Sequence, residues 1–281
     1  MSPVAEVRPS PIAGAWYSGD PERLRRQVQG CLDAARLPEL PGRVVAVIAP
    51  HTGHRYSGKT PGYAFAAVRG TRPGLVAVVS PLHQPYPGSI LTTAHRAYAT
   101  PLGELRVDQA ALGALEEALA ASGIDLARIP NDREHSIEIE LPFLQVALEG
   151  EFTLLPLMVR SQSPLVALNL GRALGRLLKE RGGLLVASTD LSHFYPEEQA
   201  REFDLEMLRR MRGFSPDDLF TAERTGKGFA CGVAAAAAVL WASRELGADC
   251  VEILHHSTSA AETGDHASVV GYGAAAVLKI A

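Results

Sequence analysis

Histidines follow two of the apolar runs that read as buried strands. His51 comes just after residues 44–49, and His83 comes just after residues 75–79. The carboxyl ends of parallel strands gather at one edge of a sheet. Two neutral imidazoles that meet at such an edge are a common start for a transition-metal site. One histidine alone would be read more simply as a ring hydrogen-bonded to a neighbouring loop, so it is the pair that favours a metal.

A third apolar run, residues 184–188, is followed by Asp190 and His193. These two side chains suit a metal ligand, or an acid–base histidine whose tautomer is set by a carboxylate. In the alternative reading, Asp190 or Ser192 simply caps the helix that follows.

Cys231 lies at the start of an apolar helical stretch, residues 229–246. A cysteine in such a run is ordinarily a small core residue, and Cys31 and Cys250 are interpreted that way. Cys231 differs because glycine lies beside it and because a helix N-terminus favours the thiolate. It is therefore a candidate ligand.

Glu134 and His135 precede a helix predicted over residues 137–148. A polar lead-in with acidic residues near the positive end of a helix explains them without any function. His135 would nevertheless face the same sheet edge and could contact a substrate. His255 and His256 end a predicted strand, where adjacent side chains point to opposite faces, so at most one of them could reach the site.

Strands and helices alternate along the chain, which predicts a three-layer αβα sandwich with a central, mostly parallel sheet. No repeat or long linker divides the chain, so residues 1–281 are expected to form one domain. The predicted strands cover residues 44–49, 75–79, 153–159, 184–188, 250–254 and 268–278. The predicted helices cover residues 20–36, 108–121, 137–148, 164–180, 197–212 and 229–246.

Composition excludes several classes of protein. The 281 residues carry a net charge of −4, which provides no basic surface for nucleic acid or an anionic membrane. The longest apolar stretch is shorter than the roughly 20 residues that span a bilayer. Three cysteines are too few for a disulfide framework, and no secretory leader is evident, so a cytoplasmic location is expected.

Several motifs, in order along nearly the whole chain, resemble the MEMO family, whose microbial members are called AmmeMemoRadiSam system protein B. They are Ala13-Gly14-Ala15-Trp16-Tyr17, Ala49-Pro50-His51 through Tyr56-Ser57-Gly58, Ser80-Pro81-Leu82-His83, Glu134-His135-Ser136-Ile137-Glu138, Ser188-Thr189-Asp190-Leu191-Ser192-His193, Ala230-Cys231-Gly232 and Ser268-Val269-Val270-Gly271-Tyr272.

The resemblance implies a fold like that of the class III extradiol dioxygenases, which are non-haem iron enzymes. It implies a metal held by His51, His83 and Cys231, with His193 as the acid–base residue. Asp190 and His135 would line the same pocket. The resemblance also implies a functional association with radical-SAM and AMMECR-type proteins.

Among the positions that depart from the pattern of the family, three are expected to affect the pocket. His54 replaces a usual aromatic residue, Gln84 replaces a frequent second histidine, and His256 replaces a common tyrosine. None of these is a presumed ligand. Together with Glu134, they are expected to line the substrate pocket and to change its polarity.

The expected function is an Fe(II)-dependent, oxygenase-like enzyme that acts on a small molecule, a phenol among the candidates. Iron follows from the resemblance alone, because a softer thiolate donor also suits copper, and two histidines with a cysteine also describe a zinc centre. Two alternatives stay open. One is a non-catalytic binding or scaffold protein that retains the pocket. The weaker one is a zinc hydrolase in which Asp190 or Glu134 activates water.

Overall fold

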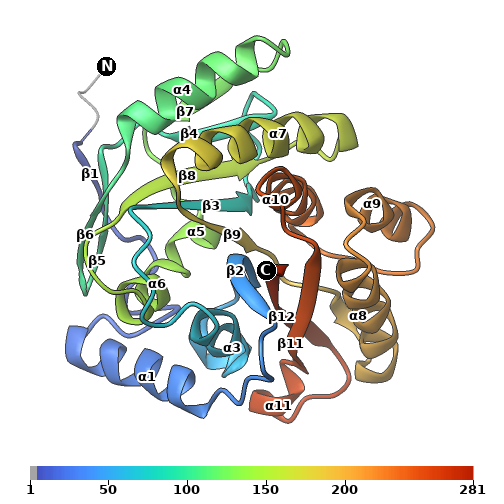
Figure 1. The fold of residues 1–281 in the computed structure, drawn as a ribbon. Helices are drawn as coiled ribbons and strands as arrows, with labels where there is room; N and C mark the ends of the chain where they lie inside the picture. Colours follow the sequence, from blue (N-terminus) through green and yellow to red (C-terminus); the bar gives the residue numbers. More distant parts are fainter. Residues whose placement is uncertain (1–4, 281) are drawn as a thin grey trace.

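The structure is a computed structural model that describes residues 5–280, and Figure 1 shows its layers. The strands are β1 (Val7–Arg8), β2 (Gly42–Ala49), β3 (Leu75–Pro81), β4 (Ile90–Thr93), β5 (Ala97–Thr100), β6 (Gly103–Arg106), β7 (Leu126–Ile129), β8 (Thr153–Val159), β9 (Leu184–Ser188), β10 (His193–Tyr195), β11 (Cys250–Thr258) and β12 (Val269–Ile280).

The helices alternate with these strands along most of the chain. They are α1 (Pro21–Ala34), α2 (His54–Ser57), α3 (Thr60–Ala66), α4 (Gln109–Ala120), α5 (His135–Glu138), α6 (Leu141–Ala147), α7 (Pro164–Arg181), α8 (Glu197–Arg212), α9 (Pro216–Arg224), α10 (Val233–Glu245) and α11 (Ala260–Thr263).

A nine-stranded sheet forms the middle layer, in the order β10-β12-β2-β9-β3-β8-β4-β7, with β11 also paired to β12. The four central strands, β2, β9, β3 and β8, are parallel. Strand β12 is antiparallel to β2, and β4 is antiparallel to β8. A second sheet holds β1, β5 and β6. The predicted αβα sandwich with a mostly parallel sheet is confirmed.

Helices cover both faces of the large sheet (Figure 1). Helices α7 and α10 pack together on one face, and α1, α3 and α6 lie on the other. Strands β3 and β9 are buried along their whole length, as continuous apolar runs predict. Gly171 of α7 permits the close approach of α10, because a Cβ there would lie 2.6 Å from the carbonyl oxygen of Ala238.

Two predicted helices have different bounds in the structure. The helix expected over residues 137–148 is divided into α5 and α6, because Pro142 has no N–H to continue the hydrogen bonding and occupies the first turn of α6. The helix expected from residue 229 begins only at Val233, after a turn that contains Cys231 and Gly232. Within residues 5–280, no helix has the length and apolarity to cross a membrane.

Candidate metal centre

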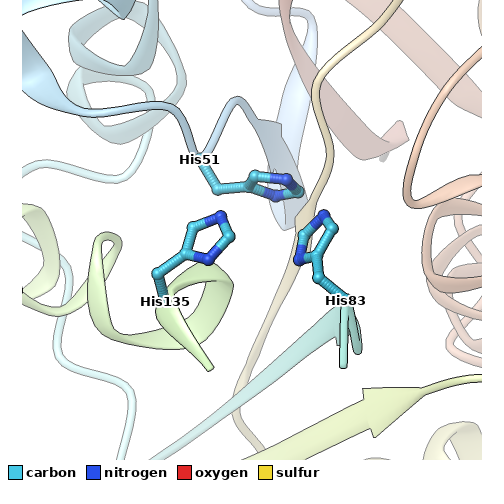
Figure 2. Close-up of side chains that lie close together, drawn as sticks. All are labelled: His51, His83 and His135. Atoms are coloured by element: carbon cyan, nitrogen blue, oxygen red, sulfur yellow. The ribbon is translucent and has the colours of Figure 1, made fainter. Parts of the chain in front are cut away.

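Three imidazole rings from separate elements converge at the carboxyl edge of the parallel strands (Figure 2). His51 follows β2, His83 follows β3, and His135 is the first residue of α5. The ring centroid of His51 lies 5.2 Å from that of His83 and 5.5 Å from that of His135. The rings of His83 and His135 are stacked at 4.7 Å. The sequence predicted this convergence for His51 and His83, and expected His135 to face the same edge.

Two groups of three side chains have ligand atoms within 4.8 Å of one another in the part of the chain that is described. One is His51, His83 and His135, and the other is His51, Asp190 and Cys231. The predicted trio of His51, His83 and Cys231 is neither of these groups: His83 belongs to the first, Cys231 to the second, and His51 to both.

His51 is buried, and both of its ring nitrogens have partners. Its Nδ1 lies 3.0 Å from the hydroxyl oxygen of Ser188, and its Nε2 lies 3.1 Å from the sulfur of Cys231. Burial lowers the pKa of His51 to about 4, against the smaller opposing effect of Asp190. The ring is therefore neutral at pH 7, which is the state that binds a metal.

Asp190 ties the loop after β9 to the loop after β2. Its Oδ1 accepts hydrogen bonds from the backbone N–H groups of His51, at 2.9 Å, and Thr52, at 3.3 Å. Its Oδ2 accepts the Thr52 hydroxyl and lies 3.8 Å from Nε2 of His51. The carboxylate therefore faces the centre but is already engaged by three donors.

Cys231 lies in the turn before α10, with its sulfur beside Nε2 of His51. The backbone N–H of Asp190 donates to this sulfur at 3.3 Å. The sequence predicted a thiolate favoured by a helix N-terminus. The structure corrects this, because burial, reinforced by the charge of Asp190, raises the pKa of Cys231 well above its usual value. A metal ion would have to displace the thiol proton.

Glu134, which the sequence predicts to line the substrate pocket, accepts hydrogen bonds that hold His83 in place. Its Oε2 accepts the backbone N–H of His83 at 2.7 Å, and its Oε1 accepts Nδ1–H of the same residue at 2.9 Å. Oε1 also accepts the N–H groups of His135 and Ser136. Burial alone would raise the pKa of Glu134, but the hydrogen bonds from His83 and the neighbouring imidazoles outweigh it and hold that pKa far below the usual range. His83 consequently presents Nε2 to the centre.

A buried arginine holds the segment around Glu134 in place through hydrogen bonds and ion pairs. Arg8 of β1 is 0% exposed and donates to Asp132 at 2.9 Å, to Glu138 at 2.5 Å and to the carbonyl oxygen of Glu134 at 2.6 Å. Tyr98 also donates to Asp132. No pattern in the sequence separated Arg8 from an ordinary surface arginine, because its partners lie more than 120 residues away.

His193, predicted as the acid–base residue, has its tautomer set by a different group than expected. Nδ1 of its ring donates to the carbonyl oxygen of Leu191 at 2.9 Å, and Nε2 lies 4.0 Å from Oδ2 of Asp190. The carbonyl, rather than Asp190, therefore orients the ring. Its side chain is 34% exposed and lines a cavity of about 250 Å³ that also contains Cys231 and Phe229.

The three remaining predicted pocket residues are not part of either ligand group. His54 packs against Tyr17 and Phe143 and lines a separate cavity of about 680 Å³. Gln84 is exposed on the loop after β3. His256 lies inside β11, because that strand continues to Thr258, and its Nε2 is 2.9 Å from Asp204 of α8.

Aromatic side chains border the centre, and sequence reasoning did not assign them a role. Trp16 lies against the ring of His135, with centroids 4.2 Å apart. Trp16, Thr52 and Tyr56 line a cavity of about 410 Å³. Trp16 is 36% exposed and Tyr56 is 45% exposed. Both occur in the motifs that carried the family resemblance, and this was the available signal.

Comparisons with known proteins agree with this architecture. A MEMO1 family protein of Nitrosopumilus maritimus is 31% identical over 95% of this chain and 98% of its own. MEMO1 family proteins of Methanothermobacter thermautotrophicus and Aquifex aeolicus are each 32% identical over 95% of this chain, and over 98% and 97% of their own lengths. The crystal structure of an uncharacterized Escherichia coli K12 protein shares the fold, with a TM-score of 0.53 and 18% identity over 82% of this chain and 99% of that one. The sequence profile of the family described as Memo-like protein matches residues 8–276, and the chain belongs to this family.

Proposed function

We propose that this protein binds a transition metal, Fe(II) in the first place, and acts as an oxygenase-like enzyme on a small phenolic molecule. His51, His83 and Cys231 are the proposed ligands, with His135 as the alternative to Cys231. The observation that carries the proposal is the convergence, at the edge of the sheet, of three imidazole rings, of which the buried ring of His51 is neutral, and a half-buried cysteine beside His51.

The donor set fits such a metal. The Nδ1 atoms of His51 and His83 are engaged by Ser188 and Glu134, which leaves Nε2 of each ring available. The N–H of Asp190 that donates to the sulfur of Cys231 would stabilise a thiolate. When bound, Fe(II) would supply open coordination positions for a substrate and for O₂.

His193 is suited to the proton transfer that a phenolic substrate needs. Because Nδ1 of His193 donates to a carbonyl, its Nε2 can accept the proton of a substrate hydroxyl. Phe229 and Tyr195 in the same cavity would pack against an aromatic ring. The carboxylate oxygens of Asp190 and Glu134 are already engaged by hydrogen bonds from backbone N–H groups. This argues against either carboxylate as the base of a zinc hydrolase.

Metal analysis of protein purified without oxygen tests the proposal. We expect about one equivalent of iron in the wild-type protein. His51→Ala and His83→Ala should abolish binding, whereas His266→Ala, at an exposed histidine on the surface, should not change it. Unchanged iron content in both variants of the centre would refute the proposed site.

The third ligand is identified by loading the metal-free protein with Co(II). Loss of the sulfur-to-cobalt charge-transfer band in Cys231→Ser, with the band retained in His135→Gln and in the matched control Cys250→Ser, would assign Cys231. Wild-type protein that binds Co(II) without this band, and that loses Co(II) affinity in His135→Gln but not in Cys231→Ser, would assign His135.

Turnover is tested by O₂ consumption of the iron-loaded protein with catechols and related phenols. Consumption that His193→Gln reduces by about 10²–10⁴-fold, with iron content unchanged, would support the catalytic part of the proposal. Metal binding without O₂ consumption would favour a binding or scaffold protein. Hydrolysis that zinc restores and iron does not would favour a hydrolase.

A further inference from the structure

The hydroxyl group of Ser188 has more partners than its single proton can serve. Ser188 ends β9 and is fully buried. Its Oγ lies 2.7 Å from the carbonyl oxygen of Ser136, 2.7 Å from Oε1 of Glu140 and 3.0 Å from Nδ1 of His51. A hydroxyl donates one hydrogen bond and accepts two.

The carbonyl oxygen of Ser136 can only accept, so it takes the proton of Ser188. It needs this donor because the helix is interrupted beside it. In a continuous helix the N–H of Glu140 would donate to Ser136, but here it donates to Ile137 at 3.1 Å. The other two neighbours of the Ser188 hydroxyl must then donate to it. This requires His51 to carry its proton on Nδ1 and Glu140 to be a neutral carboxylic acid.

The surroundings of Glu140 agree with a neutral acid. Glu140 is 0% exposed, and its other oxygen, Oε2, has no hydrogen-bond partner within the described chain. No cation forms an ion pair with it among residues 5–280, and the charged group that acts on it is Asp190, of like sign. An isolated carboxylate with one neutral partner is very costly to bury. Burial, the main cause, accordingly raises the pKa of Glu140 well above its usual value.

We propose that Glu140 is a positioning residue that, as a neutral hydrogen-bond donor, acts through Ser188 to hold His51 as the Nδ1–H tautomer. Nε2 of His51 then keeps its lone pair directed toward Cys231 and the proposed metal. In the metal-free protein this lone pair accepts the S–H of Cys231. The inference rests on the proposed function only in taking His51 as a ligand.

The tautomer can be measured without any metal. In metal-free protein labelled with ¹⁵N-histidine, the resonances of His51, assigned by their loss in His51→Gln, report which ring nitrogen is protonated. We expect a protonated Nδ1 and an unprotonated Nε2 in the wild-type protein and in Glu140→Gln, because an amide NH₂ can also donate to Ser188. Ser188→Ala should shift His51 toward the Nε2–H tautomer. A wild-type His51 protonated on Nε2 would overturn the proposal.

Metal affinity then tests the consequence, with Co(II) alone as the probe. Glu140→Gln should bind within about threefold of wild type. Ser188→Ala and Glu140→Leu, which remove the donor chain, should weaken binding about 10–100-fold, as is typical when a partner of a metal-bound histidine is lost. Glu180→Gln, at an exposed glutamate of α7, serves as the control.

The outcomes separate the two proposals. If Glu140→Gln lost as much affinity as Glu140→Leu, the neutral-donor role would be wrong, since the amide NH₂ can still donate to Ser188. If the wild-type protein bound no metal, the proposed function would fail, while the tautomer measurement would still decide this inference. If Glu140→Leu did not fold, Glu140→Gln and the ¹⁵N spectra would suffice.

Discussion

Replacing Glu134 by glutamine should weaken the hydrogen bonds that hold His83 by more than the loss of one charge suggests. Glu134 accepts four N–H groups, from His83 twice and from His135 and Ser136. Glutamine has one oxygen, so in either orientation its NH₂ group faces at least one of these donors. The best orientation keeps three bonds, now neutral, and sets NH₂ against the backbone N–H of His83.

The magnitude follows from these bonds. A hydrogen bond to a charged group contributes about 1.5–3 kcal/mol and a neutral one about 0.5–1.5 kcal/mol. Losing one bond and weakening three, offset by the lower cost of burying a neutral group, gives a destabilisation of about 2–4 kcal/mol. Because Nδ1 of His83 also loses its anionic partner, Co(II) affinity should fall about 10–100-fold.

The pH dependence provides a separate readout. Because the pKa of Glu134 is depressed in the folded protein, its contribution to stability is present above the unfolded value of 4.5 and is lost as the pH falls below it. Glu134→Gln should therefore lose less stability than wild type between pH 5 and pH 3. Urea unfolding over this range and Co(II) titration at pH 7 measure both effects. Glu149→Gln, at an exposed ion pair, is the control, and stability and affinity for Glu134→Gln equal to this control would refute the reasoning.

Three further predictions concern stability, each measured by urea unfolding. Arg8→Lys should lower the free energy of unfolding by about 3–5 kcal/mol, because a single ammonium group cannot donate to all three partners of the buried guanidinium. The control Arg72→Lys, at the surface, should change it by less than about 1 kcal/mol. Glu140→Gln should gain stability relative to wild type as the pH rises above 4.5. The reason is that Glu140, whose pKa is raised in the folded protein, keeps its proton there but releases it in the unfolded chain, so the wild-type protein loses stability while the glutamine variant does not. Parallel pH profiles of the two proteins would contradict this. Gly271→Ala should cost about 1–3 kcal/mol, because its Cβ would lie 1.9 Å from a carboxylate oxygen of α8, while Gly113→Ala in α4 has open space and should be neutral or stabilising.

The sheet, and the edge at which the candidate ligands meet, could be predicted from sequence because both depend on local patterns. Continuous apolar runs mark strands that are buried on both faces, and parallel strands place the residues that follow them at one edge. His51, His83 and Asp190 all follow such runs, and all three lie at that edge. Element bounds were less predictable where a turn interrupts an apolar pattern, as it does before Val233.

The hydrogen-bond partners of the site could not be predicted, because they come from distant parts of the chain. His256 and Asp204 are 52 residues apart, and Arg8 and Glu138 are 130 residues apart. Neither pair has a spacing that a local pattern detects. His256 is predicted as a pocket residue because it replaces a common tyrosine of the family, and no local pattern indicates that its Nε2 lies 2.9 Å from the buried carboxylate of Asp204.

The acidic residues at 132, 134, 138 and 140 show most clearly that the role of a side chain depends on its place in the fold. In the sequence, Glu134 belongs to an acidic lead-in to a helix, and Glu138 and Glu140 fall within the helix predicted over residues 137–148. In the fold all four are buried, and each has its own role. Asp132 and Glu138 share Arg8, Glu134 accepts from His83, and the carboxyl group of Glu140 meets the hydroxyl group of Ser188. Because burying a carboxyl group is costly unless it is paired or neutral, their concentration behind two histidines is best explained by the need to hold those imidazoles in one orientation.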